Sequence, residues 1–312
     1  MPGTVPPPEP RAVDLDGPVR YVEWEGPAGR TFVLVHGLGG SHANWMLVGP
    51  GLAAHGRVLA LDLPGFGRTP LAGRSPGLAS LRATLSAFVR EVAGGRAVIA
   101  GNSMGGTLAI LQGALEPDTV EGLVLTGPAL PISRAAVPAP VALGSFTLYR
   151  VPVVGEFVVS QRFARVPPEL QVRIGFRILA GDPRAIGAEV VRAHAEILRE
   201  HAHDPEAAAA FVGAARSLLR LLWRPRAYRH LMARVRAPVL LLHGRRDPLV
   251  PVAYARQAVA ENPSWRLRVF PDLGHVPQLE DPERWLARVE AWLADELPAP
   301  VPGGAPTLPA PA

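Results

Sequence analysis

Short apolar runs alternate with longer amphipathic stretches along most of the chain. The runs are rich in valine, leucine and isoleucine, a composition typical of strands that are buried on both faces of a parallel sheet. They occupy residues 31–35, 57–61, 96–100, 121–125, 238–242 and 266–270. Stretches with the spacing of an amphipathic helix lie between most of them, at residues 77–92, 104–115, 252–261 and 282–296. The alternation predicts an α/β fold, with a mostly parallel, doubly wound sheet and helices on both of its faces.

One interval interrupts this alternation. Residues 130–236 separate two predicted strands, which is far longer than an ordinary connection between neighbouring elements. The interval contains amphipathic patterns of its own, near residues 168–180, 185–199 and 207–223. We therefore expect a helical lid over the carboxyl edge of the sheet, inserted between a first core part at residues 11–129 and a second at residues 237–297.

Both ends of the sequence differ in composition from the rest. Residues 1–10 are rich in proline, and residues 298–312 combine proline, alanine and glycine without periodicity, which predicts a disordered leader and a disordered tail. The first residues show no basic segment followed by an apolar one, so we expect no secretory signal and a cytoplasmic location. Residues 135–159 are apolar, but arginine, glutamate and proline interrupt them. We expect no transmembrane segment there, and only weak interfacial contact with a membrane stays open.

The composition removes several kinds of chemistry. The 312 residues include no cysteine, which excludes disulfides, a cysteine nucleophile and sulfur-ligated metals. The net charge of +5 comes from arginines dispersed along the chain, with no lysine, so no basic tract indicates a nucleic-acid partner. The sequence HAHD at residues 201–204 resembles part of a metal site but lacks further ligands at a suitable spacing. We expect no metal, no cofactor and a small-molecule substrate.

The strongest chemical signal is GNSMGG, residues 101–106, between a predicted strand and a predicted helix. This is the G-x-S-x-G pattern of a nucleophile elbow in its required context. A tight turn from strand to helix forces the serine into strained backbone angles and lifts its hydroxyl off the sheet, which requires small flanking residues. The N-terminus of the following helix adds a partial positive charge where an anionic intermediate would form. The pattern predicts Ser103 as a nucleophile.

A glycine-rich loop, HGLGG at residues 36–40, follows another predicted strand and is placed to face the same site. Backbone N–H groups in such a loop stabilise an oxyanion together with the N–H of the residue after the nucleophile. The sequence therefore predicts an oxyanion hole formed by Leu38 and Met104, with Gly39 as the alternative to Leu38. His36 is expected to brace the turn through a hydrogen bond and not to react.

The predicted base and acid come late in the chain. His275, in LGHVPQLEDP, follows the last predicted strand, and Asp247, in HGRRDPLVP, follows the strand before it. The order Ser103, Asp247, His275 is the one that this kind of elbow enzyme uses, and sites gather at the carboxyl ends of such strands. Asp272 is an alternative orienting acid, close to the histidine in sequence. Asp62, in DLPGFGRT, is expected to hold a loop.

Together HGLGG, DLPGFGRT, GNSMGG, HGRRDPLVP and GHVPQLEDP resemble the successive signatures of the α/β-hydrolase superfamily. The resemblance covers the chain apart from its termini and the expected lid. It implies a Ser-His-Asp triad and an acyl-enzyme intermediate, and it favours a carboxylic ester hydrolase for small to medium apolar esters. Epoxide hydrolases and haloalkane dehalogenases of this fold use an aspartate nucleophile, and Ser103 argues against both.

Three alternatives stay open. GNSMGG is similar to the elbow of carbon–carbon bond hydrolases that cleave meta-cleavage products, the vinylogous diketones of aromatic-ring degradation. Those enzymes have a tryptophan after the catalytic histidine, where this chain has Val276, and a glycine–proline oxyanion loop in place of HGLGG. The second alternative is a ligand-binding or signalling protein on a hydrolase fold. The third is a lipase that acts at a membrane surface.

Overall fold

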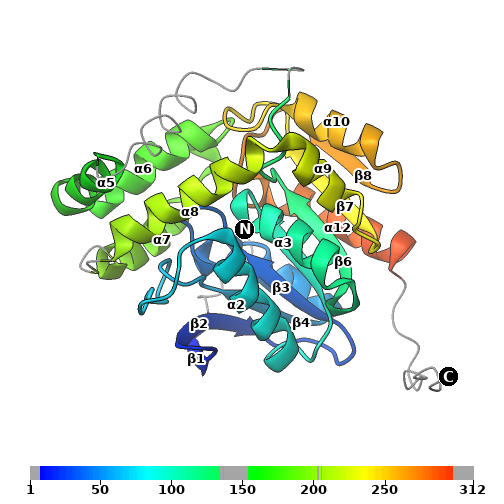
Figure 1. The fold of residues 1–312 in the computed structure, drawn as a ribbon, viewed down its shortest axis with the longest axis horizontal. Coiled ribbons are helices and arrows are strands. Elements are labelled where there is room, and N and C mark those ends of the chain that lie inside the picture. The colour runs from blue at the N-terminus through cyan, green and yellow to red at the C-terminus, as the bar shows by residue number, and fades with distance from the viewer. Residues whose placement is uncertain (1–7, 134–135, 137–153, 202–203, 205, 298–312) are drawn as a thin grey trace.

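Eight strands of the computed structural model form one sheet in the order β1-β2-β4-β3-β5-β6-β7-β8 (Figure 1). From β4 to β8 in this order neighbouring strands are parallel, whereas β2 is antiparallel to β4 and β1 to β2. The predicted α/β fold with a mostly parallel, doubly wound sheet is confirmed. The strands are β1 (Arg11–Asp14), β2 (Pro18–Trp24), β3 (Thr31–Val35), β4 (Arg57–Leu61), β5 (Ala97–Asn102), β6 (Val120–Thr126), β7 (Val239–Gly244) and β8 (Arg266–Phe270).

The structure describes most of the chain. Residues 1–7 of the expected leader, the whole expected tail and most of the apolar stretch at residues 135–159 lie outside the described residues. Among the described helices, none combines the length and the apolar composition that crossing a bilayer requires. The described residues are 8–133, 136, 154–201, 204 and 206–297.

The apolar pattern does not predict β1 and β2. Polar residues interrupt the apolar side chains of β2: Arg20 is exposed between Val19 and Tyr21, which are buried. The strand predictions depend on continuous apolar runs, which mark strands that are covered on both faces. Predictions of this kind therefore do not find the hairpin of β1 and β2 at the margin of the sheet.

Helices cover both faces of the sheet. The four helices predicted for the core agree with α2, α3, α10 and α12 to within one residue at each end. Helices α2, α3, α9 and α10 pack on one face, and α1 and α12 pack on the other. The helices are α1 (Gly49–Leu52), α2 (Leu78–Glu91), α3 (Met104–Leu115), α5 (Val154–Arg165), α6 (Pro168–Leu179), α7 (Ala188–His201), α8 (Ala207–Leu222), α9 (Pro225–Met232), α10 (Val252–Glu261), α11 (Pro277–Glu280) and α12 (Pro282–Glu296).

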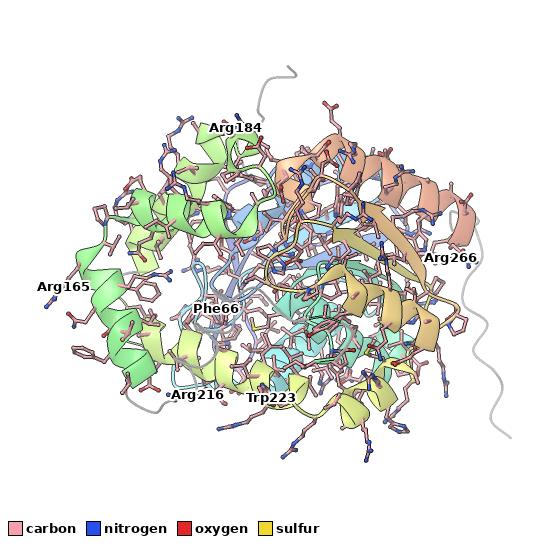
Figure 2. All side chains as sticks on the ribbon, turned by 90° about the horizontal axis from the view of Figure 1, so that it is seen from above. Phe66, Arg165, Arg184, Arg216, Trp223 and Arg266 are labelled. Carbon is pink, nitrogen blue, oxygen red and sulfur yellow. The ribbon has the colours of Figure 1, made fainter. Side chains whose placement is uncertain are left out.

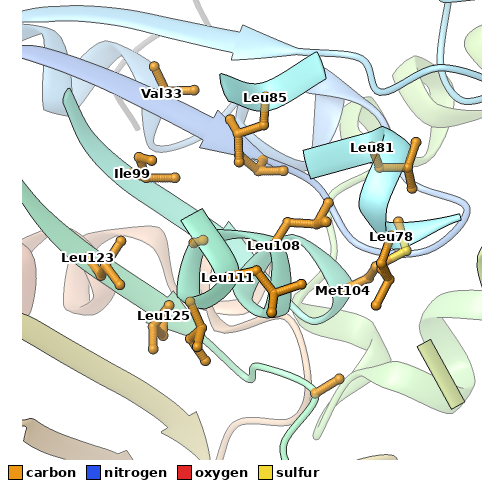
Figure 3. Close-up of a cluster of buried hydrophobic side chains, with 14 of the residues drawn as sticks. Val33, Leu78, Leu81, Leu85, Ile99, Met104, Leu108, Leu111, Leu123 and Leu125 are labelled. Carbon is orange, nitrogen blue, oxygen red and sulfur yellow. The ribbon is translucent and has the colours of Figure 1, made fainter. Parts of the chain in front are cut away.

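Successive residues of the central strands face two different hydrophobic cores. Val33, Ile99 and Leu123 contact the apolar sides of α2 and α3 (Figure 3). Phe32, one residue before Val33, belongs to the opposite core with Trp285 of α12. Because helices cover both faces, the edge formed by the carboxyl ends of the parallel strands is the place left for a site.

Helices α5 to α8, which lie between β6 and β7 in the sequence, form a layer of their own beside the sheet (Figure 1). Helices α6, α7 and α8 correspond to the three amphipathic segments predicted in this interval, while the sequence pattern did not predict α5 or the short α9. The Arg68 guanidinium contacts Glu200 of α7 (2.8 Å), which fixes this layer to the core. After α8, the Tyr228 hydroxyl of α9 donates to the Ala129 carbonyl (3.0 Å). We call α5 to α8 the inserted helices.

Candidate active site

Ser103 occupies a sharp turn between β5 and α3. Its φ of 54° and ψ of −115° lie in a region that side-chain-bearing residues rarely adopt. Backbone hydrogen bonds hold this conformation, because the Ser103 N–H donates to the Thr126 carbonyl, and the Ser103 carbonyl accepts from the N–H groups of Thr107 and Ala129 (3.1 Å each). The turn has the strained geometry that the elbow pattern predicts.

Two flanking glycines make this turn possible. A Cβ atom on Gly101 would lie 2.3 Å from the Gly105 carbonyl oxygen, and one on Gly105 would lie 2.1 Å from the Val35 carbonyl oxygen. Both distances are far below van der Waals contact, and the obstructing atoms are backbone. The small residues of GNSMGG are therefore a steric requirement of the turn, as expected from the sequence.

His275 and Asp247 form a buried hydrogen-bonded pair at the carboxyl ends of β8 and β7. Their Nδ1 and Oδ2 atoms are 2.7 Å apart, and the two side chains are 3% and 0% exposed. The other carboxylate oxygen, Oδ1, accepts from the N–H groups of Leu249 and Val250 (2.8 and 2.9 Å). Asp247 is thus anchored to its own loop by one oxygen while the other orients the imidazole.

The Asp247 carboxyl is held in its charged form. Burial alone raises its pKa, but the electrostatic interaction with the His275 ring and the hydrogen bond to it outweigh that effect, so the pKa lies below its ordinary value. Asp272, the alternative orienting acid, points elsewhere: both of its oxygens contact the Arg284 guanidinium (2.9 and 3.0 Å) at the surface. Of the two candidate acids, only Asp247 is hydrogen-bonded to His275.

The HGLGG loop passes directly beside Ser103. A Cβ atom on Gly37 would lie 3.1 Å from the Ser103 Cβ atom, which shows how closely the loop backbone approaches the serine. His36 braces this loop as expected: its Nδ1 donates to the Gly37 carbonyl (2.7 Å), and its Nε2 accepts from the Leu63 N–H (3.0 Å). Leu38 and Ser103 line the same cavity.

Met104 is the first residue of α3 and is fully buried. No carbonyl within a helix accepts the N–H groups of its first turn, so the Met104 N–H is free of the helical ladder. The partial positive charge of the α3 N-terminus lies at the same point. The predicted oxyanion donors, Leu38 and Met104, thus belong to the two backbone segments that flank Ser103.

A cavity of about 820 Å³ links these groups. Ser103 and His275 line it from the core, and the inserted helices supply most of its apolar wall, including Phe176 of α6 and Phe211 of α8. Its size is in the range of small-molecule sites. Phe66, which lines the cavity, lies in the interior of the view in Figure 2, whereas Arg165 and Arg184 point outward from the inserted segment.

The remaining polar candidates have structural roles. Asp62 is fully buried and accepts hydrogen bonds from the N–H groups of His42 (2.6 Å) and Arg68 (2.8 Å), so it holds its loop as expected. The HAHD segment lies partly outside the described residues. Within the described part of the chain, no cluster of three or more histidine, aspartate or glutamate residues could hold a metal ion.

Sequence reasoning missed two residues that support this site. Gly127 has a φ of +48°, and a Cβ atom there would lie 3.3 Å from the His275 Nδ1 and 3.4 Å from the Asp247 Oδ2. A side chain at position 127 would therefore crowd the pair. The second residue is Glu280, whose carboxylate accepts from the N–H of Gly274, the residue before His275 (2.9 Å). Glu280 also accepts from the Gly181 N–H, 99 residues away. Both roles involve neighbours distant in sequence, which no local pattern indicates.

A second histidine, His194 of α7, lines the cavity wall. Its Nδ1 donates to the Val190 carbonyl (2.8 Å), and its ring contacts Phe176 edge-on at 5.2 Å between centroids. Its Nε2 atom is buried and has no hydrogen-bond partner among the described residues. Burial lowers the pKa of His194 to about 4. At a pH between this value and the ordinary pKa of histidine, the imidazole is therefore neutral in the folded protein and protonated in the unfolded chain.

We expect this histidine to make the fold less stable in acid. Between the unfolded pKa of about 6.5 and the folded value, only the unfolded chain binds the proton, so stability falls as the pH falls. The full shift corresponds to about 3 kcal/mol of unfolding free energy. Urea unfolding of the wild type and His194→Phe at pH 7.5 and pH 4.5 measures the effect. The variant should lose less stability than the wild type, and equal losses would contradict the prediction.

The strained serine elbow, the buried His–Asp pair and the sheet that presents them define an α/β hydrolase. Residues 32–289 match the model of the alpha/beta hydrolase family, and the chain belongs to that family and is a hydrolase. The predicted resemblance is confirmed.

Two curated relatives differ in their reactions. The chain is 32% identical over 262 residues to the pimeloyl-[acyl-carrier protein] methyl ester esterase of Aromatoleum aromaticum, with 83% of this chain and 96% of the relative covered. It is 29% identical over 264 residues to the 2-hydroxy-6-oxononadienedioate/2-hydroxy-6-oxononatrienedioate hydrolase of Comamonas testosteroni, with 81% and 83% covered.

Among solved structures, a serine hydrolase from the polyaromatic hydrocarbon-degrading bacterium Cycloclasticus zankles shares the fold. The TM-score is 0.73 at 17% sequence identity, and the match covers 93% of this chain and 99% of that one. At this level of identity the likeness concerns the fold alone.

Proposed function

We propose that the protein is a serine esterase in which Ser103 is the nucleophile, His275 the general base and Asp247 the residue that orients the base. The observation that carries the proposal is the 2.7 Å bond between His275 and Asp247, in a pair whose histidine lines the same cavity as the strained serine. A nucleophile, a base and an oriented third group are the elements of covalent acyl transfer.

In the proposed reaction, His275 Nε2 takes the hydroxyl proton of Ser103 as the serine oxygen attacks the ester carbonyl. The backbone N–H groups of Leu38 and Met104 stabilise the resulting oxyanion. Collapse of the intermediate breaks the bond to the alcohol oxygen, which leaves with the proton from His275. A water molecule, deprotonated by His275, then attacks the acyl-enzyme, and the proton returns to Ser103 as the acid departs.

The walls of the cavity indicate the substrate class. Leucine, isoleucine and phenylalanine side chains dominate the part of the cavity that the inserted helices form, which favours a small to medium apolar acyl group. We propose that the inserted helices act as a lid that excludes water from this part. The Aromatoleum aromaticum relative, an esterase by name, agrees with an ester substrate.

Carbon–carbon bond cleavage is the second candidate, because the Comamonas testosteroni relative is a hydrolase of an oxononadienedioate. Both reactions need a base and an oxyanion hole, so His275 and the backbone N–H groups of Leu38 and Met104 serve either one. Val276 adds an apolar surface next to the base in place of the expected tryptophan. The choice between the two reactions depends on the substrate that the cavity accepts.

Hydrolysis of p-nitrophenyl esters of increasing acyl length tests the proposal. We expect multiple turnovers, with kcat/KM rising from acetate toward medium chains as the apolar wall is filled, at roughly 0.8 kcal/mol, or about fourfold, per buried methylene. A ring-fission product is assayed in parallel. If folded protein cleaves no ester but cleaves the ring-fission product, the esterase proposal is wrong. A single slow turnover on both would favour a ligand-binding role.

A further inference from the structure

The backbone of His275 is fixed from two distant parts of the chain. Its N–H donates to the carbonyl of Leu179, the last residue of α6 (2.8 Å), and its carbonyl accepts from the Asn102 side-chain amide (3.2 Å). Asn102 directly precedes Ser103, whereas Leu179 belongs to the inserted helices and lines the cavity. The residue proposed as the base is thus bonded directly both to the elbow and to the cavity wall.

Glu280 adds a second connection between the same segments. Its Oε2 accepts from the Gly181 N–H (2.7 Å), and its Oε1 accepts from the Gly274 N–H (2.9 Å). Gly181 follows α6, and Gly274 directly precedes His275. The carboxylate therefore joins the end of α6 to the loop that carries the imidazole, through hydrogen bonds of the strong, charge-assisted kind.

The two backbone segments are also in close contact. A Cβ atom on Gly274 would lie 2.4 Å from the Gly181 nitrogen, and a Cβ atom on Gly181 would lie 2.6 Å from the Asp272 carbonyl oxygen. There is no room for a side chain between the two segments. The Glu280 carboxylate lies at their edge and accepts from the N–H groups of both. A shift of either segment breaks one of its hydrogen bonds.

Burial of Glu280 has an energetic cost. The residue is 7% exposed, and in the described part of the chain no arginine or histidine forms an ion pair with it. Burial raises the pKa of its carboxyl, and the N–H groups of Gly181 and Gly274 act in the opposite direction. A carboxylate without a counter-ion in the interior is unfavourable unless hydrogen bonds compensate it, and here those bonds come from the two segments that must stay together.

We propose that Glu280 is a positioning residue that holds the end of α6 and the His275 loop together, so that the cavity wall and the base keep a fixed geometry. The inference rests on the proposed function for its kinetic consequence. It goes beyond that function because Glu280 contacts neither the serine nor the imidazole side chain. A displacement of about 1 Å of a reacting group is enough to lower turnover by roughly 100-fold.

Three variants test this role. Glu280→Ala removes both hydrogen bonds, Glu280→Gln retains one acceptor oxygen, and Glu283→Gln is the control, since Glu283 is an exposed carboxylate on the neighbouring helix α12. With p-nitrophenyl butyrate, we expect Glu280→Ala to lower kcat by about 10- to 100-fold while KM changes little. Glu280→Gln should recover part of the loss, and the control should match the wild type.

A merely structural role gives a different result. In that case Glu280→Ala would have a lower Tm, but kcat measured well below that Tm would stay within about twofold of the wild type, and the proposal would be overturned. If Glu280→Ala does not fold, Gly181→Ala probes the same contact from the side of the inserted helices. It should show the same loss of kcat, and unchanged kcat in a folded Gly181→Ala protein would also overturn the proposal.

One measurement is independent of esterase activity. The proton between His275 Nδ1 and Asp247 Oδ2 should give a low-field proton NMR resonance in the wild type and in Glu283→Gln. We expect this resonance to broaden or disappear in Glu280→Ala and to broaden less in Glu280→Gln, which keeps one acceptor oxygen. A resonance as sharp as that of the wild type would overturn the positioning role. Absence of ester turnover in the wild type, by contrast, would contradict only the proposed function.

Discussion

Replacing Ser103 by alanine should lower kcat for p-nitrophenyl ester hydrolysis by about 10⁶-fold, which leaves only the acceleration of roughly 10³- to 10⁴-fold over water that the oxyanion hole and substrate binding supply. Without the hydroxyl oxygen no acyl-enzyme forms, and the base has no proton to accept from the protein. Alanine also fits the turn no worse than serine does at a φ of 54°, so the variant should fold. Initial rates of the wild type and Ser103→Ala with the preferred ester measure the effect.

Ser86→Ala is the matched control. Ser86 lies on α2, away from the cavity, and its hydroxyl donates to Glu116 (2.6 Å), so its loss should lower Tm but not kcat. A phosphonate probe for activated serines gives a second measurement: intact-mass analysis should show one adduct on the wild type and on Ser86→Ala, and none on Ser103→Ala. An adduct on Ser103→Ala, or a loss of kcat below tenfold, would remove Ser103 from its role.

Replacing Asp247 by asparagine should lower kcat by about 10⁴-fold. The asparagine carbonyl can still accept from the N–H groups of Leu249 and Val250, which keeps the loop in place. Its NH₂ group then faces His275 Nδ1 as a donor, so it favours the wrong tautomer of the imidazole. The carboxylate that stabilises the protonated imidazole is also lost. The measurement is kcat at a pH well above the lowered pKa of Asp247.

Asp272→Asn distinguishes between the two acids that the sequence left open. It removes a carboxylate that is close to His275 in sequence but contacts Arg284 at the surface, so we expect kcat close to that of the wild type and a small change in Tm. A larger loss of kcat in Asp272→Asn than in Asp247→Asn would show that the hydrogen bond to Asp247 does not orient the base.

The central strands and the elbow were predictable because their signals are local. A buried parallel strand is a continuous apolar run, and the turn at Ser103 needs small residues within three positions of the serine. The outer hairpin was not predictable from such runs, since Arg20 and Glu23 interrupt the apolar residues of β2. The same holds for α9, whose eight residues give too short a pattern to stand out.

The partners of the candidate residues were predictable only in part. Chain order favoured Asp247 over Asp272, but the sequence carries no information about which carboxylate points at the imidazole. Glu280 lies inside the motif GHVPQLEDP, yet its contact with Gly181 spans 99 residues. The same holds for Gly127. Only glycine fits there because the His275–Asp247 pair packs against it, and the sequence does not show that contact.

The contacts of His275 have a consequence for how the protein folds. Asn102 ends β5, Leu179 ends α6 and His275 follows β8, so the three residues come from distant parts of the chain. The sheet can begin to form from neighbouring strands, but the imidazole has no fixed place until the last strand docks and α6 is present. Contacts of such long sequence separation form slowly. Catalytic competence should therefore be the last property to appear during refolding, after the sheet and its two cores have formed.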